Sequence, residues 1–160
     1  VTPALFKKYK TVSDYAQADK KEFEAYIRPT GFYHAKAKHI LETAKIIHEH
    51  FEDNVPRTMK EMLTLPGVAR KTANVVLGNA CGVVDGIAVD THVMRLSQRL
   101  GFTKKTDPIN IEKELAALFP KKNWFPLTYR LIDHGRALCE AKKPKCGVCP
   151  LNKLCPSALL

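Results

Sequence analysis

The pattern of apolar and polar positions along the chain predicts helices throughout. In most segments apolar residues recur three or four positions apart, which is the period of a helix with one buried face. After Gly31, for example, Ile40, Ala44, Ile47 and Phe51 are spaced to lie on one such face. No stretch sustains an alternation of apolar and polar residues with a period of two, so we expect an all-α fold.

Start and stop signals divide this pattern into separate helices. A short amphipathic helix is expected over residues 1–9, and Pro and Gly are expected to end several later ones. The residues expected to cap a helix start are Asp19, Thr58, Asp90 and Asp107. The faces expected to be buried carry Thr72, Val75, Val76 and Ala80 in a helix over residues 69–81, Ile111, Leu115 and Leu118 in the next but one, and Leu127, Leu131 and Leu138 in the last.

The segment Leu65-Pro66-Gly67-Val68-Ala69-Arg70-Lys71 predicts a tight turn between two helices. Pro66 and Gly67 end the first helix, and Gly67 leaves room for a backbone N–H to approach a ligand. The first turn of the second helix has unpaired N–H groups and the positive end of the helix dipole, which suit a phosphate. An ordinary loop between helices is the alternative interpretation.

Two residues in and after this turn could carry chemistry. A positive charge is unfavourable at a helix N-terminus, so a desolvated Lys71 would lose its proton more easily and become a nucleophilic amine. Asp90, in Val89-Asp90-Thr91-His92, could stabilise developing positive charge or relay protons. It could also simply cap a helix, and both roles are compatible because capping would fix the direction of the carboxylate.

Charge and composition narrow the partners. The 160 residues include 26 Lys and Arg against 16 Asp and Glu, a formal charge of +10 that favours an anionic partner such as nucleic acid. A basic protein without such a partner is the alternative. The sequence has no apolar run of about 18 residues and no secretory or transit signal at its start, so we expect no membrane and a cytoplasmic location.

Four of the five cysteines form one run, C-x6-C-x2-C-x5-C, at the end of the chain. Cys139, Cys146, Cys149 and Cys155 could ligate one compact centre, and such a pattern in an intracellular protein indicates metal rather than disulfides. Zinc sites more often use two separated C-x2-C pairs, so the uneven run favours an iron–sulfur cluster. Cys81 is alone in an apolar segment, and we expect it to be a small buried residue.

These three motifs, in this order and spacing, resemble the endonuclease III family of the helix-hairpin-helix DNA glycosylase superfamily. The match runs from Val1 to about Cys155. It implies a six-helix barrel domain over residues 1–84 and a domain with a [4Fe–4S] cluster over residues 85–160. It also implies an active site in the cleft between the two domains.

The resemblance implies a base excision repair DNA N-glycosylase that also cleaves abasic sites by β-elimination. The substrate would be an oxidised pyrimidine, flipped out of double-stranded DNA, and the enzyme would be a monomer. Lys71 would attack the sugar, Asp90 would be the acidic partner and the four cysteines of the run would hold the cluster. Related adenine-removing glycosylases lack a lysine at the position of Lys71, which favours the bifunctional branch.

The resemblance also implies DNA contacts. Phe32 falls where the family places an apolar wedge opposite the flipped base, although Phe32 and Tyr33 could instead be core residues. Three lysines lie between the first two cysteines of the run and suit phosphate contacts, although they could form a merely solvated basic loop. The residues expected at DNA are Leu65, Gly67, Ala69 and Arg70 in the turn, Phe32, and Lys142, Lys143 and Lys145 in the loop.

The chain departs from the family pattern in two places. Ala69 stands where the turn usually has glycine, and its methyl group would hinder the closest approach to a phosphate. Family members also have a further pair of helices before the position of Val1, so we expect an N-terminally incomplete barrel with reduced stability and activity.

Other functions stay open at this stage. The same fold could remove another damaged base, or act as a lyase only. A non-catalytic DNA-binding module with a structural cluster is the alternative from a different class. Lys71 and Asp90 together favour an enzyme, because binding alone requires neither.

Overall fold

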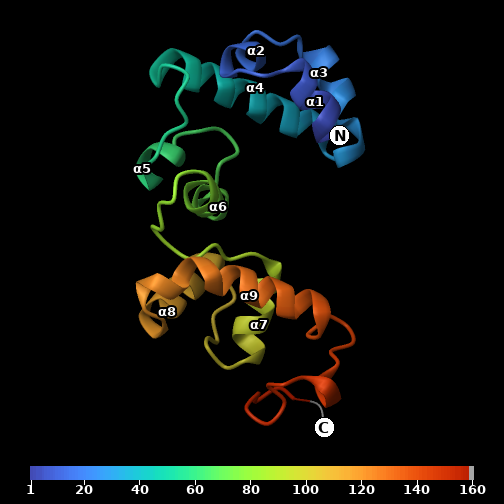
Figure 1. The fold of residues 1–160 in the computed structure, drawn as a ribbon, viewed down its shortest axis with the longest axis vertical. Coiled ribbons are helices and arrows are strands. Elements are labelled where there is room, and N and C mark those ends of the chain that lie inside the picture. Colours follow the sequence, from blue (N-terminus) through green and yellow to red (C-terminus); the bar gives the residue numbers. More distant parts are fainter. Residues whose placement is uncertain (159–160) are drawn as a thin grey trace. The chain divides into compact units, whose positions relative to one another are not determined.

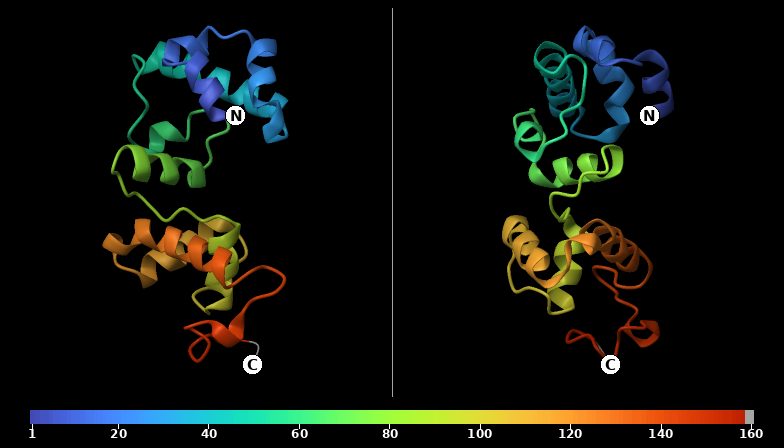
Figure 2. Two further views of the ribbon diagram at one scale, coloured as in Figure 1. Left: turned by 45° about the vertical axis from the view of Figure 1, so that its right-hand side comes forward. Right: turned by 60° about the vertical axis from the view of Figure 1, so that its left-hand side comes forward.

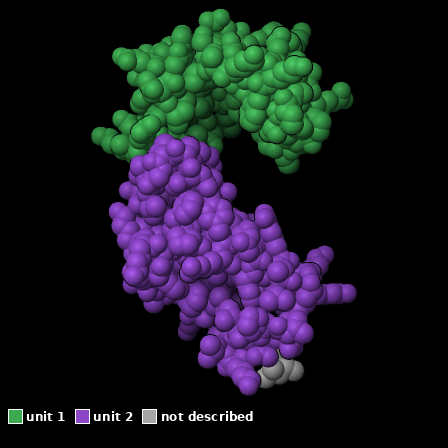
Figure 3. All heavy atoms as spheres, viewed as in Figure 1, with its two compact units in different colours: residues 1–69 green, residues 70–160 purple. Residues whose placement is uncertain are grey.

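The computed structural model describes residues 1–158, and over that range the secondary structure is entirely helical. The all-α fold predicted from the sequence is therefore confirmed. The backbone forms two compact units, Val1–Ala69 and Arg70–Leu160 (Figure 3), which we describe separately. The domain boundary expected between residues 84 and 85 is a different division and stays a prediction.

The first unit has a long helix, α4, against which two shorter helices, α2 and α3, pack (Figure 1). Its core contains Leu5, Tyr9, Phe23, Ile27, Ala37 and Leu41. The elements are α1 Thr2–Lys8, α2 Val12–Ala16, α3 Lys20–Ile27, the 3-10 helix η1 Arg28–Thr30, α4 Tyr33–His50 and α5 Met59–Met62.

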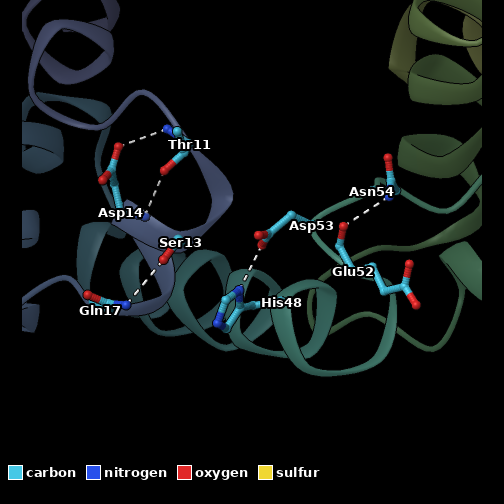
Figure 4. Close-up of polar contacts among 8 residues, drawn as sticks. All are labelled: Thr11, Ser13, Asp14, Gln17, His48, Glu52, Asp53 and Asn54. Carbon is cyan, nitrogen blue, oxygen red and sulfur yellow. Dashed lines mark hydrogen bonds and ion pairs between the residues drawn. The ribbon is translucent and has the colours of Figure 1, made fainter.

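Local polar contacts fix the ends of these helices (Figure 4). The backbone N–H of Asp14 donates to Thr11 Oγ1 at 3.2 Å, and the Asp14 carboxylate accepts from Thr11 N at 2.9 Å, so α2 begins with a complete capping box. Backbone hydrogen bonds from Lys10 and Thr11 lower the pKa of Asp14. Just after α4, His48 Nδ1 lies 2.8 Å from Asp53 Oδ1.

The buried face of α4 differs from the one predicted. Ala44 and Ile47 are buried as expected, but Leu41 is buried and Ile40 is 39% exposed. The two residues are adjacent, and a period of 3.6 residues allows either to join a face that contains Ala44. Packing against α2 and α3 selects the face that begins with Ala37 and Leu41.

The second unit has a core formed where α7 packs against α8 and α9 (Figure 2). Buried residues of this core include Val93, Leu96, Ile111, Leu115, Leu127 and Leu131. The elements are α6 Arg70–Ala80, α7 Thr91–Arg99, α8 Pro108–Leu118, η2 Lys121–Asn123, α9 Trp124–Ala137 and η3 Cys146–Val148. No helix in the described part of the chain is long and apolar enough to cross a membrane.

Several side-chain predictions for this unit are wrong. The buried residues of α6 are Ala73, Asn74 and Leu77, whereas Thr72 and Ala80 are exposed, because polar contacts made by Asn74 turn its own face inward. Val75 and Val76 are half-buried. Leu118, the last residue of α8, is 57% exposed, and Leu138, just after α9, is only half-buried. Cys81 is half-buried rather than buried, since α6 ends one residue before it.

Candidate active site and cluster loop

The turn between α5 and α6 is built around Pro66 and Gly67. Gly67 has a φ of +73°, and a Cβ at this position would lie 2.7 Å from Nδ1 of His39, so any other residue would be strained twice over. Thr43 Oγ1 donates to the carbonyl of Pro66 at 3.0 Å and fixes the turn to α4. The open space that we expected beside Gly67 is therefore filled by His39 on its Cα side.

Two other turn residues expected at DNA differ in exposure. The side chain of Leu65 is only 4% exposed, so only its backbone could reach a ligand. Ala69 is exposed and immediately precedes α6, which places its backbone at the N-terminal end of that helix.

Arg70 and Lys71 are the first two residues of α6 and differ in environment. Arg70 Nε donates to Glu112 Oε2 at 2.7 Å and Nη2 donates to Oε1 at 3.0 Å, forming a bidentate pair with α8. These hydrogen bonds raise the pKa of Arg70. The Arg70 side chain is thus engaged within the protein, and a DNA contact would fall to its backbone N–H.

Lys71 is exposed, so the desolvation that we expected for it is absent from this structure. The reason is the orientation of the first turn of α6, because Arg70 faces α8. The ammonium group is free to reach a ligand beside the N–H groups at the start of the helix.

Asp90 caps α7, as the sequence predicted. Its Oδ1 accepts hydrogen bonds from the backbone N–H groups of His92 and Val93, each at 2.8 Å. Oδ2 has no hydrogen-bond partner among the described residues, which leaves this oxygen of a half-buried carboxylate for chemistry. Asp90 and Lys71 belong to the same compact unit.

Phe32 is not a core residue. Its side chain is 90% exposed, and its backbone has a φ of 48° immediately before α4. A bulky side chain in this left-handed region is uncommon. Tyr33, by contrast, is partly buried against the core of the first unit.

The four cysteines of the C-terminal run line one pocket in the second unit, together with the apolar side chains of Leu96, Leu100 and Leu138. All four are half-buried free thiols on the irregular loop after α9, drawn in red in Figure 1. No three His, Cys, Asp or Glu residues in the described range are grouped to hold a single metal ion. Four thiols spread around one pocket instead suit a polynuclear iron–sulfur cluster.

Two arginines of α7, which the sequence analysis did not single out, hold the start of this loop. Arg99 Nη1 donates to Cys139 Sγ at 3.2 Å and to the Glu140 carbonyl at 2.8 Å, and Nη2 donates to the Ala141 carbonyl at 2.8 Å. Arg95 Nη2 donates to the Cys139 carbonyl at 3.0 Å. The positive charge of Arg99 favours the thiolate form that a metal requires.

The three lysines of the loop are all exposed, but they are not equivalent. Lys145 Nζ lies 3.0 Å from Glu140 Oε1 and donates to the Ala137 carbonyl at 3.2 Å. Lys142 and Lys143 make no side-chain hydrogen bond or ion pair with the described residues, so they are the better candidates for phosphate contacts.

Comparison with known proteins identifies the family. A model of the HhH-GPD superfamily of base excision DNA repair proteins matches residues 1–121, and a model of the iron–sulfur binding domain of endonuclease III matches residues 139–155. Endonuclease III of Synechocystis sp. is 54% identical over 158 residues, which are 99% of this chain and 72% of that protein. Endonuclease III of Bacillus subtilis is 46% identical over 97% of this chain and 71% of that protein.

The chain belongs to the endonuclease III family of HhH-GPD base excision DNA repair proteins. Among solved structures, a trapped covalent intermediate of an endonuclease III with DNA superposes with a TM-score of 0.92 at 43% identity, covering 98% of this chain and 74% of that one. A thermostable thymine-DNA glycosylase gives 0.87 at 26% identity, covering 98% and 74%.

These comparisons confirm the enzyme class and the cofactor predicted from the sequence. This endonuclease III-family protein is a DNA glycosylase and abasic-site lyase of base excision repair. Its cofactor is a [4Fe–4S] cluster, which fits the pocket lined by the four cysteines. The sequence signal that could have revealed Glu112 earlier is its charge beside the buried positions Ile111 and Leu115.

Proposed function

We propose that this endonuclease III-family protein removes oxidised pyrimidines from double-stranded DNA and then cleaves the resulting abasic site, with Lys71 as nucleophile. The observation that carries this proposal is the environment of Lys71. Its amine is exposed in the first turn of α6, whereas the neighbouring Arg70 is tied to Glu112. Lys71 is thus the residue at this helix end that is free to reach a sugar.

The reaction follows from amine chemistry. The neutral Nζ of Lys71 attacks C1′ of the flipped nucleotide, the C1′–N bond breaks, and the base leaves with its electron pair and takes up a proton. Loss of a second proton from Nζ and opening of the sugar ring give an imine. The imine acidifies the C2′ hydrogen, and loss of that proton expels the 3′ phosphate and cuts the strand.

Asp90 would assist through its Oδ2. The hydrogen bonds from His92 and Val93 hold Oδ1 and so orient the carboxylate. Its negative charge stabilises the positive charge that develops on the sugar as the base leaves, and it can take the proton lost by Lys71. When bound, the cluster would keep the loop from Cys139 to Cys155 in shape, and the reaction uses no redox step.

The DNA contacts that accompany this proposal involve both units. Phe32 would act as the wedge that fills the space of the flipped base, and its exposure supports this. Lys142 and Lys143 would bind phosphates, as would the backbone N–H groups around Gly67, Ala69 and Arg70. We further propose that the enzyme acts as a monomer on DNA inside the cell.

Borohydride trapping tests the nucleophile and the substrate together. The full-length protein is incubated with duplexes that each contain one oxidised pyrimidine, one oxidised purine or one abasic site. We expect a covalent adduct with the oxidised pyrimidines and the abasic site, and none with Lys71→Gln. An adduct on the abasic site alone would mean a lyase only, and trapping by Lys71→Gln at the wild-type level would mean another nucleophile.

A further inference from the structure

Glu112 of α8 is a buried carboxylate, with only 6% of its surface exposed. A buried charge is costly unless it is paired and hydrogen-bonded. Its donors all come from α6. Arg70 donates at 2.7 and 3.0 Å, and Asn74 Nδ2 donates to Oε1 at 3.2 Å.

The same carboxylate also contacts the segment that leads to Asp90. A Cβ at Gly86 would overlap Oε1 of Glu112 and would lie 3.0 Å from Nδ2 of Asn74. The absence of a side chain at Gly86 therefore allows this backbone to lie directly against Glu112. The residues that follow, Ile87 to Val89, are buried and lead without a break to Asp90.

We propose that Glu112 is a positioning residue that sets the geometry of both reactive groups. The proposal rests on the proposed roles of Lys71 and Asp90. Glu112 touches the helix turn that carries Lys71 and the backbone four residues before Asp90, although it is far from both in the sequence.

Pairing with Arg70 determines where Lys71 points. Successive residues of a helix are about 100° apart around its axis, so fixing the Arg70 side chain against α8 fixes the direction in which Lys71 leaves the first turn. The carboxylate also offsets the positive charge of Arg70 next to the reacting amine. Loss of the pair would let the first turn rotate or fray and would leave that charge uncompensated.

The neighbouring Glu114 is a matched control. It is a partly buried carboxylate of the same helix that accepts a hydrogen bond from Thr103. Thr103 lies neither on α6 nor in the segment that leads to Asp90. Removing the charge of Glu114 therefore perturbs α8 without touching either reactive group.

The experiment compares Glu112→Gln, Arg70→Lys, Gly86→Ala, Glu114→Gln and Lys71→Gln in the full-length, cluster-loaded protein. For each variant, cluster absorbance, affinity for a duplex with a stable abasic-site analogue, and the borohydride-trapping rate constant at saturating abasic DNA are measured. We expect Glu112→Gln and Gly86→Ala to lower the rate constant by about tenfold to a hundredfold, since small misplacements of reacting groups have effects of this size. Their affinity and cluster absorbance should stay at the wild-type level.

Arg70→Lys keeps the charge but loses the bidentate geometry, and should be slowed in the same way. Glu114→Gln should trap at the wild-type rate. The inference is wrong if Glu112→Gln traps at the wild-type rate, or if Glu114→Gln is slowed as much. If Glu112→Gln does not fold with its cluster, Arg70→Lys and Gly86→Ala decide, and wild-type rates in both overturn the inference. Trapping by Lys71→Gln would instead overturn the proposed nucleophile.

Discussion

Arg99 donates a hydrogen bond to the sulfur of Cys139 at 3.2 Å, across 40 residues of sequence. The same guanidinium donates to the carbonyls of the two residues that follow Cys139. One side chain at the end of α7 therefore holds both a proposed cluster ligand and the backbone of the loop that carries it. The interaction with sulfur is strongest when Cys139 is a thiolate.

We expect Arg99→Gln to weaken retention of the cluster, because it removes this positive charge and most of the donors that hold the loop. The measurement is the decay of cluster absorbance in the presence of an iron chelator, which should be several-fold faster than in the wild type. Arg136→Gln is the control, since Arg136 is an exposed cation of α9 outside the cysteine pocket. Equal decay rates for Arg99→Gln and the wild type would contradict this role.

Changing single cysteines should separate the cluster ligands from the remaining thiol. Cys146→Ala and Cys149→Ala should lose iron and solubility, because the loop has few buried apolar residues to fold around without a cluster. Cys81→Ala should retain the wild-type iron content, since Cys81 does not line the cysteine pocket. Elemental analysis of anaerobically purified protein should find iron, and zinc without iron would refute the assignment.

Two substitutions of Asp90 should separate its charge from its capping role. Asp90→Asn keeps a good helix cap and should change the free energy of unfolding little while slowing base release strongly. Asp90→Ala should slow base release and also lower the free energy of unfolding by about 0.5–2 kcal/mol. The measurements are single-turnover base release and denaturant unfolding. Unchanged base release in Asp90→Asn would reduce Asp90 to a cap.

Phe32→Asn should stabilise the protein and impair its function. Asn tolerates the left-handed backbone and can cap α4, so the free energy of unfolding should rise by about 1 kcal/mol. Loss of the exposed ring should weaken binding to lesion-containing duplexes, as measured by fluorescence anisotropy. Phe32→Trp, which keeps an apolar ring, serves as the control. Full affinity of Phe32→Asn would exclude the wedge role.

Gly67→Ala should destabilise the turn before α6. The positive φ and the approach of His39 both oppose a methyl group, so we expect a loss of more than about 1 kcal/mol in the free energy of unfolding. Gly147→Ala is the control, because a Cβ there has no atoms within 4 Å and Gly147 is not among the glycines with positive φ. Equal melting temperatures for the two variants would show that the turn accommodates the change.

The sequence alone determined the features that depend on neighbouring residues. Asp90 caps α7, and Asp19, Thr58 and Asp107 each accept from the backbone N–H three residues later. Such contacts lie within one helical turn and need no knowledge of the rest of the fold. The cysteine spacing and the motifs around Lys71 and Asp90 were likewise sufficient to identify the family, the all-α fold and the cofactor.

The tertiary structure decided which of several equivalent neighbours is buried, paired or free. Whether Ile40 or Leu41 faces the core, and whether Arg70 or Lys71 is tied to α8, depends on elements that are distant in the sequence. The pairs Arg70–Glu112 and Arg99–Cys139 join residues about 40 positions apart. No local propensity determines such pairs, because they form only when packing of the helices removes these side chains from water and requires a partner for each.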